Sequence, residues 1–411
     1  MNNAAEYNAQ ARINPVYLTA KTAVCLMAQA GIPDAEAVVR ALGLENNEPL
    51  QAMPDDDTIL GNALVVEAKY RTMCRLIEKS GYKTCVDLPC GYTPKALHLT
   101  EQGRQFIGLD LPIVVQEVAP ILRNLAKQPE RMAFYGVDAT NLTSLETALQ
   151  GVEGPLCITT EGMLMYFTDD EVIAVIANIR ALLEKYGGCW ITPDPEFVGQ
   201  FFRSFRAILG EKSLDKLKAA RNAAKGQSDV EDLGNVFILK PTDGPDDIKR
   251  AELLLAKYGL KAEKVNLAEE MPELNIYEKL TIEQISRFQE EMRNCHYWLI
   301  TLAEGERGQN TDTLTQQPFM MKYTVEKEIL QVSLTGRLDS ISAPQFLMAW
   351  EEEKADKPIA GVSIDCTNLE YISSAGIRLL QEMQKNCHQG IRFTGVNPSV
   401  AQILQQKGLD G

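Results

Sequence analysis

The chain has 411 residues, with 41 basic against 56 acidic side chains and a formal net charge of −15. Its 45% hydrophobic and 24% charged residues are typical of globular proteins with a sizeable core, which excludes a disordered, collagen-like or coiled-coil chain. The acidic balance argues against general affinity for nucleic acid or for an anionic membrane surface, because both would repel it.

The cysteines indicate a reducing compartment, and the histidines argue against a metal site. The nine cysteines form no C-x-x-C pair and mostly lie within apolar runs, so we expect reduced core thiols. The three histidines are too few and too dispersed for a zinc site, and no metal is expected. The first residues lack an apolar signal core, and no run of about 18 apolar residues predicts a membrane span. We therefore expect a cytoplasmic protein.

A polar stretch with Gly and Pro at residues 305–319 predicts a linker between two domains of unequal size. Before it, residues 1–60 are expected to form an N-terminal helical extension and residues 61–304 a larger α/β domain. After it, residues 320–411 are expected to form a small α/β domain.

Helical periodicity at 16–30, 35–42 and 63–77 precedes a series of short apolar runs that alternate with helical patterns. This alternation predicts a doubly wound, mostly parallel sheet covered on both faces. No obvious long helix follows the last run, so that strand could be antiparallel. The predicted strands are 84–88, 105–109, 132–137, 156–160, 189–192, 261–266 and 296–302.

Residues 196–255 interrupt this alternation with a helical insert that contains a phenylalanine cluster at positions 197, 201, 202 and 205. The insert could cover a ligand site, or the aromatic residues could do no more than pack against the rest of the domain. The sequence leaves both interpretations open.

The first two predicted strands carry the features of a nucleotide site. A tight turn at 88–93 follows the first strand, with Thr93 as a good helix N-cap, and Asp110 ends the second strand 19 residues beyond Gly91. This is about the spacing at which an acidic residue meets ribose hydroxyls. Gly91 stands without the further glycines of G-x-G-x-x-G, which disfavours a nicotinamide dinucleotide. S-adenosylmethionine, which has an adenosine, no pyrophosphate and a positive sulfonium, fits an acidic site better.

Further charged residues are predicted at the same edge of the sheet. Asp87 ends the first strand, and Asp138 and Glu161 follow the third and fourth. Lys69 and Arg71, on the helix before the first strand, could pair with the carboxylate of the cofactor or could belong to a solvated helix face. The sequence identifies no catalytic base.

Four segments carry a family resemblance. They are VDLPCG at 86–91, GLDLP at 108–112, GVD at 136–138 and EGMLMY at 161–166. Over roughly residues 60–302 the chain resembles the leucine carboxyl methyltransferase family, which includes O-methyltransferases of polyketide pathways. The resemblance implies a class I methyltransferase fold with a seven-stranded, mostly parallel sheet and methyl transfer from S-adenosylmethionine.

The same resemblance implies a role for each candidate residue. Gly91 would line the turn under the methionine part, Asp110 would hold the ribose, Asp138 the adenine region, and Glu161 the far wall of the site. Arg71, or Lys69, would match the basic residue of the family. The family turn reads L-G-A-G, whereas this chain has Pro89 at the second position, which removes an N–H donor.

The C-terminal segment reads as alternating strands and helices. A strand at 329–335, a turn at 336–339, a helix from Pro344 to about Lys354 and a strand at 360–365 come first. A helix capped by Ser373 or Ser374, a strand at 391–396 and a last helix begun by residues 397–398 follow. The sequences LTGRLD at 334–339 and IDCTNLEYISSAGIR at 364–378 resemble the STAS domain of anti-sigma factor antagonists.

By that resemblance, Ser374 aligns with the phosphorylated position and the partners are an anti-sigma factor or a serine kinase. A phosphate there would meet the free N–H groups of a helix N-terminus. The other interpretation is that Ser373 and Ser374 only cap the helix, since Ser373 replaces the usual Asp of the motif.

The sequence therefore predicts an S-adenosylmethionine-dependent O-methyltransferase, with a carboxylate or hydroxyl acceptor that it does not identify, fused to a STAS regulatory module. The alternative, motivated by Pro89, is a non-catalytic signalling protein whose first domain only binds a ligand. No nucleic-acid partner and no membrane span are expected.

Overall fold

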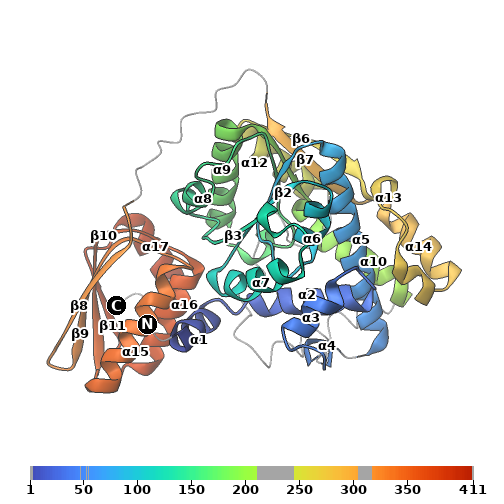
Figure 1. Ribbon diagram of the computed structural model, residues 1–411. Coiled ribbons are helices and arrows are strands. Elements are labelled where there is room, and N and C mark those ends of the chain that lie inside the picture. Colours follow the sequence, from blue (N-terminus) through green and yellow to red (C-terminus); the bar gives the residue numbers. More distant parts are fainter. Residues whose placement is uncertain are drawn as a thin grey trace. The chain divides into compact units, whose positions relative to one another are not determined.

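The computed structural model describes residues 3–46, 48–51, 53, 55–210, 245–303 and 317–409. These residues form two compact units (Figure 1). The larger unit runs from helix α2 (Tyr17–Gln29) to strand β7 (His296–Leu302). The smaller unit contains β8 (Met320–Glu326) to α17 (Pro398–Gln406) and also α1 (Asn3–Ile13), from the opposite end of the sequence.

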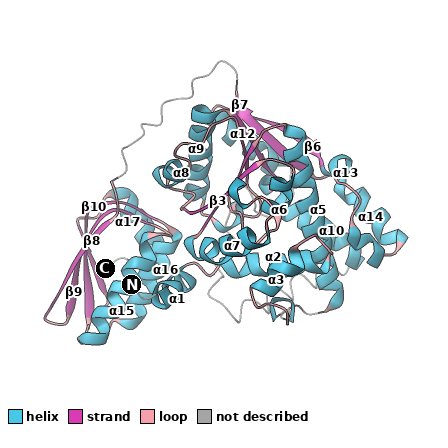
Figure 2. Ribbon diagram, in the orientation of Figure 1, coloured by secondary structure: helices cyan, strands magenta, loops and turns pink. Residues whose placement is uncertain are grey.

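The sheet of the larger unit has seven strands in the order β3-β2-β1-β4-β5-β7-β6. Figure 2 shows the strands in magenta with helices around them. Strands β1 to β5 are parallel, and β7 is antiparallel to both of its neighbours. This order, with its single reversed strand, is the class I methyltransferase arrangement that the sequence predicted, including the antiparallel last strand. The strands are β1 (Thr84–Asp87), β2 (Gln105–Asp110), β3 (Met132–Gly136), β4 (Leu156–Thr159), β5 (Gly188–Thr192), β6 (Leu260–Asn266) and β7.

Helices cover this sheet. Before β1 come α2, α3 (Ala35–Ala41), α4 (Glu48–Gln51) and α5 (Asp56–Ser80). Between the strands lie α6 (Lys95–Glu101), α7 (Pro112–Leu125), α8 (Leu142–Ala148), α9 (Asp169–Tyr186), α10 (Phe197–Leu209), α12 (Pro245–Lys257), α13 (Leu267–Glu270) and α14 (Ile282–Met292). Short 3-10 helices occur at Pro129–Arg131, Leu164–Tyr166, Asp194–Glu196 and Asn275–Lys279.

Helix α9 illustrates how the sequence sets these elements. Thr168 caps its first turn and exchanges hydrogen bonds with Glu171 in a capping box. The helix then buries an apolar stripe against the sheet, including Val172, Ile176 and Ile179. Each such side chain contributes about 1.5–3 kcal/mol when it is fully buried.

One predicted helix start is wrong by about a residue. Helix α6 begins at Lys95 with Pro94 at its cap position, and no side chain caps it. The hydroxyl of Thr93, the predicted cap, instead donates to the carbonyl oxygen of Cys90. This hydrogen bond lies within the turn that contains Gly91 and precedes the helix.

The described part of the helical insert packs into the larger unit. Phe205 is 1% exposed, its ring contacts that of Phe201 in a tilted arrangement, and it faces the backbone of Gly61 on α5. This contact supports the packing interpretation for α10. Residues 211–244 of the insert, and residues 304–316 of the predicted linker, lie outside the described residues.

The smaller unit has a four-stranded sheet in the order β11-β10-β9-β8. Its elements are β8, β9 (Ile329–Leu338), α15 (Ser342–Asp356), β10 (Gly361–Ile372), α16 (Ser374–Asn386), β11 (Ile391–Thr394) and α17. The predicted turn at 336–339 is wrong, because β9 continues to Leu338 and pairs with the long strand β10 through two register shifts. Strand β8 was not predicted, although Met321, Tyr323 and Val325 alternate along it and pack against the core of this unit.

Helix α1 completes the core of the smaller unit. Ala9 is 2% exposed and Ile13 is fully buried, and both belong to the apolar cluster formed by α15, α16 and the sheet. Arg12 pairs with Glu351 on α15 and with Glu382 on α16. The expected extension over residues 1–60 is thus divided after Pro15 between the two units.

Two expectations drawn from composition can be compared with the structure. All nine cysteines are free and buried, as predicted for core thiols. Within the described ranges, no helix combines the length and apolarity that crossing a membrane requires.

Candidate functional site

The candidate site lies at the carboxyl edge of the central strands of the larger unit. Strand β1 stands between β2 and β4, where the strand order reverses. In open α/β sheets, ligands bind outside the carboxyl ends of the strands at such a switch point. The predicted residues Asp87, Gly91, Asp110 and Glu161 all follow or end these three strands.

The turn after β1 is tied to the end of β2. The backbone N–H of Gly91 donates to Oδ2 of Asp110 at 2.7 Å, and Asp110 is only 7% exposed. Gly91 has a φ of +54°, a conformation that side chains with a Cβ rarely adopt. The predicted pair is therefore in direct contact, with a carboxylate held beside a glycine backbone.

A buried ion pair joins the end of β1 to the helix that follows the same turn. Asp87 is fully buried, and its Oδ1 lies 2.9 Å from Nζ of Lys95 and accepts a hydrogen bond from Thr159 at 2.6 Å. Burial by itself lowers the pKa of Lys95, but the charges of Asp87 and Glu161 outweigh it and raise that pKa above its usual value. Oδ2 of Asp87 has no hydrogen-bond partner among the described residues.

Lys69 is a second buried cation, and its surroundings are different. The residue is 3% exposed, and within the described part of the chain its Nζ has no hydrogen-bond partner. The ammonium lies 3.1 Å from the ring centroid of Phe197, as a cation–π contact. Burial lowers the pKa of Lys69 to about 8, against the opposing effect of Glu161 and Asp194.

Two carboxylates complete this charged cluster. Asp194, fully buried after β5, accepts hydrogen bonds from the backbone N–H groups of Gly162, Met163 and Leu164 at 2.7–3.2 Å. It therefore fixes the loop after β4 that carries Glu161. Burial raises the pKa of both carboxyls, although Lys69 acts to lower both.

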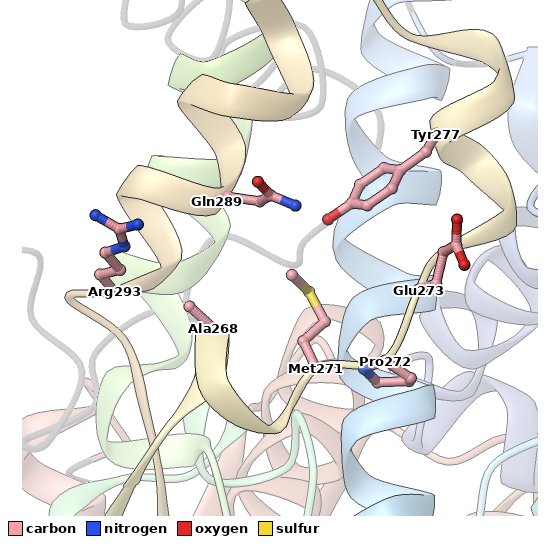
Figure 3. A pocket seen from close by; sticks show the side chains of 7 residues that line it. All are labelled: Ala268, Met271, Pro272, Glu273, Tyr277, Gln289 and Arg293. Atoms are coloured by element: carbon pink, nitrogen blue, oxygen red, sulfur yellow. The ribbon is translucent and has the colours of Figure 1, made fainter. Parts of the chain in front are cut away.

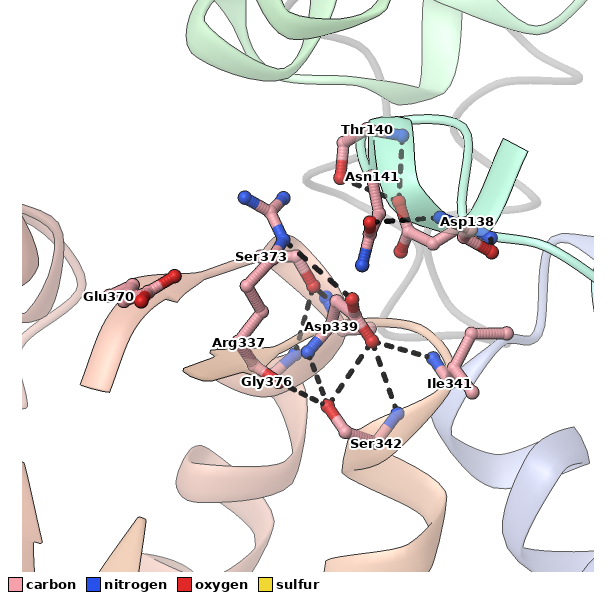
Figure 4. A network of polar contacts seen from close by, with 12 residues as sticks. Asp138, Thr140, Asn141, Arg337, Asp339, Ile341, Ser342, Glu370, Ser373 and Gly376 are labelled. Atoms are coloured by element: carbon pink, nitrogen blue, oxygen red, sulfur yellow. Dashed lines mark hydrogen bonds and ion pairs between the residues drawn. The ribbon is translucent and has the colours of Figure 1, made fainter. Parts of the chain in front are cut away.

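Two predicted residues have other partners in the structure. Nε of Arg71 lies 2.6 Å from Oε1 of Glu67, a fully buried carboxylate that also accepts the N–H groups of residues 275 and 276. Asp138 accepts hydrogen bonds from the backbone N–H and the hydroxyl of Thr140 at 2.7 and 2.5 Å (Figure 4). Of the predicted residues, Glu161 lies in the cluster around Lys69, together with Asp194 and Phe197.

Lys95 and Asp194 were not among the predicted site residues. Asp194 could have been found, because it follows the fifth predicted strand by two residues, in the same way that Asp138 and Glu161 follow theirs. Lys95 carries a weaker signal, since a lysine in the first turn of a helix opposes the helix dipole. The buried Asp87 explains its presence there.

In the smaller unit, Ser373 and Ser374 have different positions at the start of helix α16; Figure 4 shows Ser373 close to Gly376. Oγ of Ser373 caps helix α16 by accepting from the N–H groups of residues 375 and 376, whereas Ser374 is the first residue of the helix and is half-buried. Position 376 has room only for a glycine, because a Cβ there would lie 2.6 Å from the carbonyl oxygen of Leu338.

Two surface hollows of the larger unit lie away from the carboxyl edge. One, of about 460 Å³, is lined by α13, α14 and the chain between them, with Tyr277 and Gln289 directed toward each other across it (Figure 3). The other, of about 760 Å³, lies at the amino edge beside Thr84 and Gln105. Among the described residues, no group of His, Cys, Asp and Glu side chains could hold a metal ion.

Comparisons with known proteins address the two units separately. Residues 321–411 match the family model described as Mlab, STAS domain. No curated protein matches the sequence.

Solved structures similar to the chain include several methyltransferases. An O-methyltransferase family protein from Burkholderia thailandensis has 14% identity and a TM-score of 0.35, covering 68% of this chain and 70% of that one. Magnesium protoporphyrin IX methyltransferase from Synechocystis PCC 6803, with bound SAH, has 12% identity and a TM-score of 0.36, covering 60% and 87%. Human N-acetylserotonin methyltransferase, in complex with SAM, has 14% identity and a TM-score of 0.32, covering 68% and 62%. The fold class itself follows from the strand order and directions of this chain.

Proposed function

We propose that the larger unit is an S-adenosylmethionine-dependent O-methyltransferase and that the STAS unit regulates it. The observation that carries the proposal is the buried ammonium of Lys69, which has no hydrogen-bond partner among the described residues. A buried charge without such a partner is unfavourable unless a ligand completes it. The amino-acid end of S-adenosylmethionine offers a carboxylate for that purpose.

The other residues fit the remaining parts of the cofactor. Asp110 would accept hydrogen bonds from the ribose hydroxyls, Gly91 would allow the methionine part to approach the turn, and Asp138 would lie toward the adenine. Asp87 and Glu161 would supply negative charge near a positive sulfonium. We prefer Lys69 to Arg71 for the carboxylate, because Arg71 is paired with Glu67.

The bound cofactor would supply a methyl group already activated by the sulfonium. The protein then has to orient an oxygen acceptor and exclude water. A carboxylate acceptor, as in the leucine carboxyl methyltransferases that the chain resembles, needs no base, whereas a hydroxyl does. Burial raises the pKa of Tyr166 and keeps that phenol neutral, so it is a poor base. Glu161 is the better candidate if the acceptor is a hydroxyl.

Two measurements test this proposal: first the binding of S-adenosylmethionine, and then the transfer of its methyl group. Titration calorimetry with S-adenosylmethionine should show binding that weakens about 10- to 100-fold in Asp110→Ala, because each hydrogen bond to a charged group contributes about 1.5–3 kcal/mol. The exposed Asp170→Ala is the matched control and should leave affinity unchanged. Equal affinity in all three proteins, or none in the wild type, contradicts the proposed site.

A methyl-transfer assay against host extract, with identification of the acceptor by mass spectrometry, then separates an enzyme from a protein that only binds the cofactor. Methyl transfer that is lost in Asp110→Ala supports the enzyme. Tight binding without transfer to any acceptor supports the non-catalytic signalling alternative.

For the smaller unit we propose regulation through Ser374, with a serine kinase or an anti-sigma factor as partner. The cap provided by Ser373 supports this, because the cap function does not require the Ser374 hydroxyl. A phosphate at Ser374 would add about −1.5 to −2 charge at a helix N-terminus. A kinase should label the wild type and Ser373→Ala but not Ser374→Ala, and equal labelling of Ser374→Ala contradicts the assignment.

A further inference from the structure

Helix α1 covers one face of the STAS unit, although it is distant in sequence from that unit. Residues 321–411 match the STAS family model, and α1 lies outside this range. Figure 1 shows α1 beside α15 and α16. Ala9 and Ile13 belong to the same apolar cluster as residues of these two helices. The face that α15 and α16 present to α1, here called the α15–α16 face, is therefore a surface of the STAS unit that an additional helix occupies.

The contact that α1 makes with this face is small. In the described part of α1 and the residue that follows it, four side chains are buried, and two of them, Ala9 and Ile13, are apolar. The other two are amides: Nδ2 of Asn14 donates to Oε1 of Gln10 and to the carbonyl oxygen of Ser340, each at 3.1 Å. A helix of 11 residues is also marginally stable by itself in water. Such a helix can leave its seat by local opening, without global unfolding.

Charged groups on the α15–α16 face hold the last turn of α1. The guanidinium of Arg12 pairs with Glu351 on α15 and with Glu382 on α16, so one cation lies between acidic side chains from two helices. Nε of Arg378 donates to the carbonyl oxygen of Ile13 at 2.8 Å. Ile13 is the last residue of α1, where carbonyl groups lack partners within the helix and a cation is favourable. The face thus accepts a basic side chain together with the carboxyl end of a helix.

This arrangement has the anatomy of a contact between two proteins. Ile13 is fully buried, whereas Arg12 and Glu351 beside it remain about half-exposed. An apolar centre surrounded by a polar rim, with arginine enriched, is typical of interfaces between proteins. Charges around such a centre select the partner and set its orientation.

We propose that the α15–α16 face is a docking surface for a helix of a partner protein, and that α1 occupies it until the partner displaces it. The partner helix carries in its last turn a basic residue followed directly by a branched apolar residue, as Arg12 and Ile13 do. The acidic pair on the face selects the basic residue, and Arg378 selects the end of the helix. Docking of this kind involves the STAS unit alone and requires neither the proposed methyl transfer nor phosphorylation of Ser374.

Binding of a peptide to the full chain tests this proposal. The probe is a fluorescein-labelled peptide with the sequence of residues 1–16, followed by fluorescence anisotropy. The wild-type chain should bind it weakly, because its own α1 occupies the face. In the Arg12→Glu chain, Glu351 and Glu382 repel α1. This chain should therefore bind the wild-type peptide about tenfold more tightly, as expected from reversing two surface ion pairs.

Variants of the peptide test which features the face recognises. Arg12→Glu in the peptide should reduce its binding to the Arg12→Glu chain by a similar factor. Ile13→Asp in the peptide should abolish binding, because it would place a charge at a buried position. A chain with Glu351→Arg and Glu382→Arg should reverse the preference and bind the Arg12→Glu peptide rather than the wild-type peptide.

The matched control uses the same substitution elsewhere in the chain. Arg40→Glu disrupts a surface pair with Glu36 on α3, and this chain should bind the peptide as weakly as the wild type does. Protection of β10 against hydrogen exchange verifies that the STAS unit stays folded in each variant. If β10 loses protection in one of the two variants of the face, the other decides.

Equal affinity of the wild-type peptide for the Arg12→Glu, Arg40→Glu and wild-type chains would overturn the proposal. Binding that is unaffected by Arg12→Glu and Ile13→Asp in the peptide would also overturn it, and so would the absence of binding to every chain. Loss of β10 protection in both variants of the face would show that α1 is an integral part of the STAS fold rather than an exchangeable occupant, which contradicts the proposal as well.

Discussion

Lys69 and Lys95 are both buried in one site, and the structure predicts that their removal has opposite effects on stability. Burial lowers the pKa of Lys69 from 10.5 to about 8 in the folded protein. At about 1.4 kcal/mol per pH unit, the charged lysine destabilises the ligand-free fold by about 3 kcal/mol at pH 7. Lys69→Met keeps the length of the side chain and should therefore increase the free energy of unfolding by up to about that amount.

The pH dependence of this gain has a defined sign. Because the folded pKa of Lys69 is the lower one, the unfolded chain binds the proton more tightly between pH 8 and 10.5. The penalty is present in full below pH 8 and is lost as the pH rises toward 10.5. The advantage of Lys69→Met should disappear over the same range.

Lys95→Met is the matched control, and its effect should be the reverse. It leaves the fully buried Asp87 carboxylate without its ion-pair partner, which should reduce the free energy of unfolding by about 3–5 kcal/mol. If Lys69→Met destabilises the protein as Lys95→Met does, Lys69 has a structural role and its assignment to a ligand is refuted. A stabilised Lys69→Met that no longer binds S-adenosylmethionine supports that assignment.

Urea unfolding followed by tryptophan fluorescence can report on the larger unit alone. The chain has three tryptophans, of which Trp190 and Trp298 lie in the larger sheet and Trp350 lies in the STAS unit. A Trp350→Phe background therefore restricts the signal to the sheet that carries the two lysines.

Further predictions concern close contacts within each of the two units. Gly376→Ala would place a Cβ 2.6 Å from the carbonyl oxygen of Leu338, so the STAS unit should lose about 1–3 kcal/mol of stability, as measured by its Trp350 fluorescence during urea unfolding. Normal stability would show that α16 shifts freely. Asp194→Ala removes the acceptor of three backbone N–H groups and should accelerate hydrogen exchange in residues 161–166, with the exposed Asp170→Ala unchanged. Unchanged exchange there would mean that Asp194 does not hold the loop.

Much of the larger fold could be predicted from local patterns. Short apolar strands alternating with helices predicted all seven strands of the sheet to within a residue or two, because hydrophobic periodicity is a property of neighbouring residues. Asp110 and Gly91 could be paired from their 19-residue spacing, since parallel strands bring their carboxyl ends to one edge.

Two predictions failed, one through a local contact and one through a contact distant in sequence. Thr93 matches the preference for a helix cap, but the turn around Gly91 uses its hydroxyl. The residues at 336–338 look like a turn because they contain a glycine, yet pairing with a long neighbouring strand keeps them extended. At 336–338 the hydrogen bonds to a distant strand replace the local turn, whereas the hydroxyl of Thr93 bonds to Cys90 within the same turn.

The sequence by itself predicted the two α/β units and placed Asp87, Gly91, Asp110 and Glu161 at the carboxyl edge of the larger sheet, but it did not single out Lys95 or Asp194. Only the tertiary structure distinguished the two candidate cations, Lys69 and Arg71. Lys69 and Arg71 are two residues apart on one helix and look equivalent in sequence, but one is buried beside Phe197 and the other is paired with Glu67. Likewise, only the structure assigns the polar N-terminal segment to the STAS core, because Ala9 and Ile13 are too few to give an amphipathic signal. Burial and pairing depend on what the rest of the chain brings to a residue, and no local pattern contains that information.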